Sequence, residues 1–194
     1  MSMEKYLIAG LGNIGLEYEH TRHNVGFDVV DALLRKHGGD LSTQRLSIHA
    51  EIRLKGRLLV CIMPTTYVNN SGKAVRYWME KENIPIKQIL VVVDELALPL
   101  GKLRLRTGGS DAGHNGLKDI KAALGTDQYP RLRFGIGNDF PKGRQIDYVL
   151  GKWDESEVPL VQEQIAQAVG AIESFVLEGI DKTMNKVNNS TPGR

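Results

Sequence analysis

A strand-like run that ends in three glycines, Tyr6-Leu7-Ile8-Ala9-Gly10-Leu11-Gly12-Asn13-Ile14-Gly15, decides which fold this chain can adopt. The glycines match the G-x-G-x-x-G pattern of dinucleotide-binding folds, in which the third glycine lies in the first turn of a helix. After Gly15, however, a stripe of apolar side chains at helical spacing begins only at Val25. The acidic residue expected after a second strand is also missing, because Asp28 and Asp31 fall within the predicted helix. The pattern therefore favours a tight turn, with a dinucleotide site as the alternative.

Length and composition are those of one globular domain. The 194 residues include 41% hydrophobic and 25% charged residues, which is enough for an α/β core. We expect a single domain over residues 1–194, with a frayed tail from about 188 to 194. The single cysteine, Cys61, excludes an intrachain disulfide and favours a reducing compartment, so we expect a cytoplasmic protein. No signal peptide and no apolar run of about 20 residues is present, so no membrane association is expected.

Predicted strands and helices alternate along most of the chain, which favours an α/β sheet with helices on its faces. Apolar runs predict strands at 5–10, 47–53, 57–63, 89–94, 102–106 and 131–137. Periodic apolar positions predict helices at 24–37, 70–82, 113–124 and 155–178, with Asn24 capping the first and Asp154 or Ser156 the last. Residues 47–63 are predicted to form a hairpin, and the continuous apolar run 90–93 predicts a central strand covered on both faces.

Five polar clusters lie at the ends of predicted strands or in adjoining loops: Asn13, Thr21-Arg22-His23-Asn24, Asn69-Asn70-Ser71-Gly72, Asp94-Glu95 and Gly113-His114-Asn115-Gly116. In open α/β sheets, such strand ends line one crevice. There His23 could act as a base that Asp94 orients, and the asparagines could donate hydrogen bonds to an oxyanion. The alternative for each cluster is a structural histidine or a helix-capping asparagine.

Patterns that indicate other chemistries are absent from the sequence. There is neither a G-x-S-x-G elbow nor a G-x-x-x-x-G-K-[ST] phosphate loop. Without a serine or cysteine in a plausible turn, water is the expected nucleophile. His20 and His23 form an H-x-x-H pair, but no cysteine or carboxylate pattern of a zinc site accompanies them. We therefore expect neither a metal nor a cofactor.

Two runs of basic residues alternate along predicted strands. Lys102, Arg104 and Arg106 share one face of one strand, and Arg131 and Arg133 alternate in the same way. Such a face is either a solvated strand that protects a sheet edge or a surface that follows nucleic-acid phosphates. The formal net charge of +2 does not decide between the two.

In their order along the chain, these motifs resemble those of bacterial-type peptidyl-tRNA hydrolases. The resemblance rests on residues 10–13 with Tyr18, 21–24, 64–69 with 71–72, 94–96, 113–118, 131–137 and 149–152, and it extends from about residue 5 to 178. It implies a monomeric α/β fold with a twisted mixed sheet and no obligate protein partner. It also implies hydrolysis of the ester that joins a peptide to the 3′ end of tRNA, which recycles tRNA during translation.

The resemblance further implies roles for single residues. His23 resembles the catalytic base, Asp94 its partner and Asn13 a catalytic-site amide. Contacts to substrate or tRNA are implied for Tyr18, Tyr67, Asn69, His114, Asn115, Arg104, Arg106 and Arg133. Val68, Ala97 and the loop 138–143 depart from the usual family pattern, which leaves their effect on substrate binding open.

Two other functions stay open at this point. One is a relative that binds RNA without catalysis, which a turnover assay would reveal. The other is a nucleotide-dependent oxidoreductase built on the glycines of residues 10–15, which a thermal-shift screen with NAD and NADP would reveal.

Overall fold

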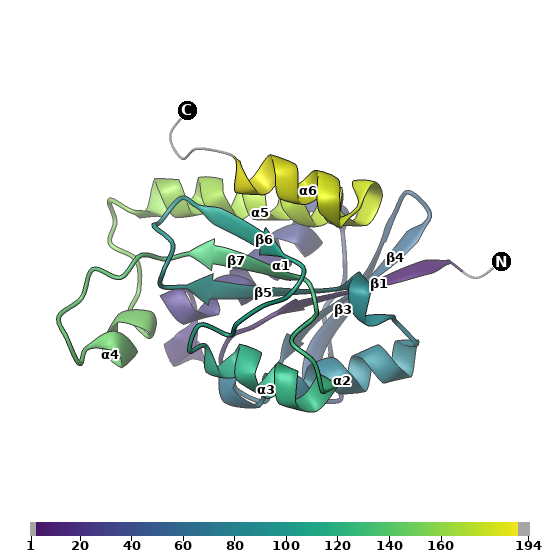
Figure 1. Cartoon of the computed structure of the whole chain (residues 1–194), viewed down its shortest axis with the longest axis horizontal. Coiled ribbons are helices and arrows are strands. Elements are labelled where there is room, and N and C mark those ends of the chain that lie inside the picture. Colours follow the sequence, from purple (N-terminus) through teal and green to yellow (C-terminus); the bar gives the residue numbers. More distant parts are fainter. Residues whose placement is uncertain (1–2, 190–194) are drawn as a thin grey trace.

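The computed structural model describes residues 3–189 and is built on one mixed sheet of seven strands (Figure 1). The strands are β1 (Glu4–Gly10), β2 (Ser42–Gln44), β3 (Ser47–Leu54), β4 (Arg57–Pro64), β5 (Ile89–Glu95), β6 (Leu103–Arg106) and β7 (Arg131–Gly135). Their order is β2-β3-β4-β1-β5-β7-β6. The central strands β4, β1, β5 and β7 are parallel, whereas β2, β3 and β6 join antiparallel. The predicted mixed sheet is confirmed.

Helices cover both faces of this sheet, as the sequence predicted (Figure 1). On one face lie α1 (Val25–His37), α5 (Val158–Glu178) and α6 (Ile180–Asn188). The other face is covered by α2 (Ser71–Glu82) and α3 (Asn115–Leu124). The short helix α4 (Gln145–Val149) lies in a long connection at the end of the sheet.

The central strand β5 shows how the sequence pattern produces this layering. All of its residues are buried. Leu90 and Val92 pack into the core beneath α1 and α5, whereas Val91 and Val93 pack into the core beneath α2 and α3. Because side chains alternate along a strand, burial on both faces requires an uninterrupted apolar run. The prediction of a central, doubly covered strand is confirmed.

The glycines of the opening motif allow a strand and a helix to pack closely. A Cβ on Gly10 would lie 2.2 Å from the carbonyl oxygen of Gly26, and one on Gly26 would lie 2.4 Å from the backbone nitrogen of Leu11. Helix α1 begins only at Val25, after two 3-10 turns. The geometry therefore lacks the helix that a dinucleotide site needs directly after the third glycine.

Three elements were not predicted, and each gives only a weak signal in the sequence. All three residues of β2 are exposed, and α4 has five residues and no buried side chain. Helix α6 follows α5 after Gly179 and buries only Thr183 and Val187. Helix α6 ends at Asn188, where the expected frayed tail of about 188–194 begins, and residues 190–194 of that tail lie outside the described part.

Asn24 is the N-cap residue of α1, as predicted, but without a side-chain cap, and the caps predicted for α5 are wrong. The side chain of Asn24 makes no capping hydrogen bond to α1 and instead contacts the backbone of Asn13. Helix α5 begins after Glu157 rather than at Asp154 or Ser156, and Glu157 accepts a hydrogen bond from the backbone N–H of Asp154. A contact to the preceding loop has replaced the side-chain cap of α1, whereas the contact at the start of α5 is local and spans three residues.

Residues 3–189 contain no candidate membrane span. None of the helices described there is both long enough and apolar enough to cross a membrane.

Candidate active site

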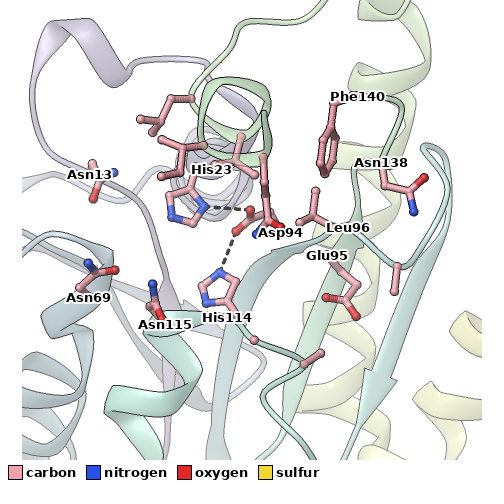
Figure 2. Close-up of a pocket in the computed structure, with 17 residues that line it drawn as sticks. Asn13, His23, Asn69, Asp94, Glu95, Leu96, His114, Asn115, Asn138 and Phe140 are labelled. Atoms are coloured by element: carbon pink, nitrogen blue, oxygen red, sulfur yellow. Dashed lines mark hydrogen bonds and ion pairs between the residues drawn. The ribbon is translucent and has the colours of Figure 1, made fainter. Parts of the chain in front are cut away.

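A cavity of about 540 Å³ lies where the central strands end (Figure 2). Six residues that the sequence predicted for a site line it: Asn13, His23, Asn69, Asp94, His114 and Asn115. They come from turns after β1 and β4, from the end of β5 and from the start of α3. In Figure 2, Asn13, Asn69 and Asn115 lie on one side of the two histidines, and Asn138 and Phe140 lie on the other side. The expected convergence of separate polar clusters on one crevice is confirmed.

Asp94 lies between two histidines at the centre of this cavity (Figure 2). Its Oδ2 is 2.8 Å from Nδ1 of His23, and its Oδ1 is 2.8 Å from Nε2 of His114. The carboxylate is 4% exposed, compared with 17% for the side chain of His23. The sequence predicted the pair of His23 and Asp94, but for His114 it predicted only a position along the channel.

The hydrogen bonds of His114 fix its tautomer. His114 is the N-cap of α3, and its Nδ1 accepts from the backbone N–H of Gly116 at 3.1 Å and of Leu117 at 3.4 Å. An imidazole nitrogen that accepts has no proton, so the proton lies on Nε2 and is donated to Asp94. The backbone at the start of α3 thus makes His114 a donor to the carboxylate.

His23 is oriented in the opposite sense. It lies in the 3-10 turn Arg22–Asn24, and Asp94 accepts the hydrogen bond from its Nδ1. The lone pair of the neutral ring is then on Nε2, which has no hydrogen-bond partner within residues 3–189. A nitrogen with this lone pair, beside a cavity, is placed to take a proton from a bound water.

Burial and charge shift the pKa of His23, and also that of Asp94, in opposite directions. Burial lowers the pKa of His23, but the charge of Asp94 and the hydrogen bond from His23 to it outweigh burial and raise the pKa. For Asp94, burial raises the pKa, but the interactions with His114 and His23 outweigh it and hold the pKa well below its usual range. Asp94 therefore stays ionised and stabilises positive charge on His23.

The same three side chains could be mistaken for a metal site. One ligand atom from each of His23, Asp94 and His114 lies within 4.8 Å of the others, and two histidines with a carboxylate form many metal centres. A metal on Nε2 of His114 would need a lone pair there. Because Nδ1 already accepts two backbone N–H groups, Nε2 carries the proton instead. The donor set therefore fits a hydrogen-bonded network better than a three-ligand metal centre.

Asn13 is held so that its amide donors are free. Its Oδ1 accepts the backbone N–H of Val68 at 2.9 Å, which leaves Nδ2 unpaired beside the cavity. The backbone N–H of Asn13 donates to Oδ1 of Asn24, and Nδ2 of Asn24 donates to the carbonyl of Asn13, at 2.9 Å each. Asn69 and Asn115 also line the cavity, and no side-chain hydrogen bond is formed by either with another described residue. The cavity therefore presents several neutral amide groups.

Arg22 joins the turn of His23 to the opposite wall of the cavity, a role that the sequence did not predict. Its backbone N–H donates to Gly151 at 3.0 Å, and its Nη1 donates to the carbonyl of Tyr148 at 3.2 Å. The guanidinium lies 4.3 Å from the centre of the Tyr148 ring and pairs with Glu157 at 3.3 Å. Helix α4, which contains Tyr148, contributes Gln145, Ile146 and Val149 to the cavity wall.

A second, basic cavity of about 360 Å³ adjoins the first. Arg104, Arg106 and Arg133 line it, and Glu95 borders both cavities. Arg133 pairs with Glu95 at 3.1 Å and donates to the carbonyl of Ser110 at 2.6 Å. Of the three basic residues expected on one strand face, Arg104 and Arg106 line this cavity, and Lys102 precedes β6 and does not line it.

Arg131 does not belong to this surface, although it alternates with Arg133. It is 1% exposed, and its guanidinium donates to the backbone carbonyls of Tyr129, Gly109 and Asp127. The strand pairs of β6 with β7 place Arg131 opposite Arg106. Arg131 therefore holds the surrounding loops together instead of facing a ligand.

The predicted aromatic residues lie outside the lining of the catalytic cavity. The rings of Tyr18 and Tyr67 meet edge to face, with centroids 6.4 Å apart. Tyr67 is 52% exposed, and its φ of 63° is strained for a residue with a side chain. Tyr67 is exposed and Tyr18 is half-buried, and the pair lies next to the turn Val68–Asn70.

Comparisons with known proteins agree on one family. The family model described as "Peptidyl-tRNA hydrolase" matches residues 7–193. The chain is 57% identical to the peptidyl-tRNA hydrolase of Phocaeicola vulgatus over 184 residues, which cover 95% of this chain and 98% of that one. For Parabacteroides distasonis the identity is 56%, with 95% and 99% covered. The crystal structure of the Acinetobacter baumannii peptidyl-tRNA hydrolase matches with a TM-score of 0.92 at 36% identity and covers 100% of both chains.

Proposed function

The chain belongs to the peptidyl-tRNA hydrolase family and hydrolyses the ester between peptide and tRNA, and we propose that His23 is the base of this reaction. The observation that supports this role is the hydrogen bond of 2.8 Å between Nδ1 of His23 and Asp94, which leaves Nε2 free beside the cavity. No other imidazole in the cavity has a free lone pair, because His114 uses its Nδ1 to cap α3.

In the proposed reaction, Nε2 of His23 takes a proton from a water while the water oxygen bonds to the ester carbonyl carbon. Asp94 stabilises the imidazolium that forms, because it is buried and ionised. The tetrahedral intermediate then collapses, and the bond between the carbonyl carbon and the ribose oxygen breaks. The imidazolium returns its proton to that oxygen, so the base is regenerated for the next cycle.

The asparagine amides are proposed to bind the polar groups of the substrate. The free Nδ2 of Asn13 is the donor proposed for the developing oxyanion, since its Oδ1 is fixed by Val68. Asn69 and Asn115 have amide groups available for the peptide backbone. Such groups recognise any peptide sequence, because every peptide bond offers the same donor and acceptor.

The tRNA is proposed to occupy the other side of Glu95. Arg104, Arg106 and Arg133 would bind backbone phosphates in the basic cavity, which gives affinity that does not depend on base sequence. The exposed ring of Tyr67 and the half-buried ring of Tyr18 would stack on bases near the 3′ end. In this arrangement, the ester lies between a neutral amide wall and a basic surface.

The domain extent, the oligomeric state and the location expected from the sequence stay predictions. We propose one domain over residues 1–194 that acts as a monomer, without an obligate protein partner and in the cytoplasm. Activity is expected to survive treatment with EDTA, and loss of activity that zinc restores would contradict the proposed metal-free chemistry.

The test of the proposed function is cleavage of peptidyl-tRNA by the wild type and two histidine variants. His23→Ala should abolish turnover while the far-UV circular dichroism spectrum stays unchanged. His20→Ala is the matched control, because His20 is three residues away, exposed and paired with Asp28. Full activity of His23→Ala would refute the proposed base, and an inactive wild type would favour the relative that binds RNA without catalysis.

A further inference from the structure

The outer edge of β6 is closed by one side chain from the last helix. β6 is the final strand of the sheet and pairs only with β7, and α6 lies against it (Figure 1). Oδ1 of Asn188 accepts the backbone N–H of Leu105 at 2.8 Å, and its Nδ2 donates to the carbonyl of Leu105 at 3.0 Å. The amide thus supplies the donor and the acceptor that a neighbouring strand would supply.

Leu105 lies between the two arginines of the basic cavity. Side chains alternate along β6: Leu103 and Leu105 are buried in the core, whereas Arg104 and Arg106 line the cavity. Holding the backbone at Leu105 therefore holds the direction of both cations. Nε of Arg104 is buried beside this cavity and has no hydrogen-bond partner among the described residues, so contacts within the protein do not fix that guanidinium.

All four residues of the strand pair with β7, but its outer edge has no strand partner. β6 has four residues and ends next to the loop of Gly108 and Gly109, where Gly109 has a φ of 121°. A short edge strand next to a glycine-rich loop frays easily unless its free edge is bonded. Asn188 supplies this bond at the middle of the strand.

From these contacts, we infer that Asn188 is a positioning residue for RNA binding: by closing the edge of β6, it aligns Arg104 and Arg106 for tRNA phosphates. The inference rests on the proposed function of the basic cavity. Helix α6, which the sequence did not predict, is then part of the tRNA-binding architecture although it does not line that cavity.

The test compares Asn188→Ala and the near-isosteric Asn188→Leu with Asn189→Ala. Asn189 is the matched control, because it is the next residue and its side chain bonds only within α6, to the carbonyl of Asn185. KM and kcat are measured for peptidyl-tRNA and for a peptidyl ester of adenosine, which has no phosphates. Loss of two hydrogen bonds should raise KM for peptidyl-tRNA about three- to tenfold in both Asn188 variants, with kcat unchanged.

The small ester separates positioning from general destabilisation. Its KM should not change in any of the three variants, because it does not reach the basic cavity. An equal rise in KM for both substrates, or no difference between Asn188→Leu and Asn189→Ala, would overturn the inference. Affinity for uncharged tRNA, measured by fluorescence anisotropy, gives the same comparison without turnover. If the wild type binds tRNA but does not cleave the ester, the proposed function fails while the role of Asn188 is still tested.

Discussion

The catalytic cavity and the basic cavity share Glu95 but differ in how their charged groups are held. In the catalytic cavity, Asp94 accepts from two rings, and each ring is oriented by that contact. In the basic cavity, Nε of Arg104 is buried and has no hydrogen-bond partner among the described residues, whereas Arg133 is held by Glu95 and the carbonyl of Ser110. Fixed dipoles suit a reaction whose charges develop at one place, whereas less constrained cations suit a flexible phosphate backbone. Changes in the first cavity should therefore affect kcat, and changes in the second should affect KM.

Asp94→Asn should give the largest effect among the neighbours of His23. An amide has one acceptor and one donor group, so it cannot accept from both His23 and His114, and it favours the wrong tautomer of His23. We expect kcat to fall about 10³–10⁴-fold, by analogy with the same change in serine proteases. Single-turnover assays on peptidyl-tRNA measure it. A fall in kcat of less than about tenfold would show that the carboxylate does not orient the base.

The pH dependence of kcat/KM should also change in Asp94→Asn. In the wild type, kcat/KM should fall as pH drops through the pKa of His23, which is raised above 6.5, because the protonated ring cannot act as a base. In Asp94→Asn the raising interactions are lost and burial, which lowers the pKa, remains. The acid limb of the residual activity should therefore move to lower pH. A limb at the same pH in both proteins would assign it to another group.

Substitution of His114 should lower kcat to an intermediate extent, and two substitutions can separate this effect from the loss of stability. His114→Ala removes a hydrogen bond to a charged group, so kcat should fall about 10- to 100-fold. It also removes the N-cap of α3, which should cost about 1 kcal/mol of stability. His114→Ser restores a capping oxygen and should recover the stability without recovering kcat. Recovery of both by serine would mean that His114 acts only as a cap.

Arg22 connects the base to the wall formed by α4, so its loss should affect substrate binding more than chemistry. Arg22→Ala should raise KM about three- to tenfold, because the wall loses the contacts to Tyr148 and Glu157. Arg22→Lys retains the charge and should recover part of this loss. KM and kcat of both variants are measured by steady-state kinetics. A fall in kcat at unchanged KM would instead mean that Arg22 acts on the chemistry of His23 and not on substrate binding.

Arg104→Ala should give the smallest effect and the clearest salt signature. Removing one phosphate contact should lower the slope of log affinity for tRNA against log salt by about one unit, with kcat unchanged. Arg35→Ala is the control, because Arg35 is 80% exposed on α1 and pairs with Asp31. Equal salt slopes for Arg104→Ala and wild type would assign Arg104 to a solvated strand face.

The sequence predicted the residues of the catalytic cavity because they follow strand ends, where an α/β sheet concentrates its site. It could not predict how they are bonded. The contact of His114 with Asp94 depends on the start of α3, and the contact of Asn24 with Asn13 replaces an expected cap. These contacts join different elements, 20 and 11 residues apart, so the pattern within one element does not reveal them.

The basic residues show the same limit. Arg131 and Arg133 are two residues apart on the same strand, so the sequence places them on the same face. Arg131 is nevertheless buried among backbone carbonyls, whereas Arg133 lines the basic cavity. Only the surrounding loops decide between these outcomes. Helix α6 escaped prediction because it buries few side chains, and its contact to β6 is made by a polar side chain.

The most direct test of the catalytic arrangement is the tautomeric state of its two histidines, measured by NMR of ¹⁵N-labelled imidazole nitrogens at neutral pH. The histidines that flank Asp94 should show opposite neutral tautomers, with the proton on Nδ1 of His23 and on Nε2 of His114. Spectra of His23→Gln and His114→Gln assign the signals. A proton on Nδ1 of His114, or a lone pair on Nδ1 of His23, would contradict a base that Asp94 orients and that a capped His114 supports.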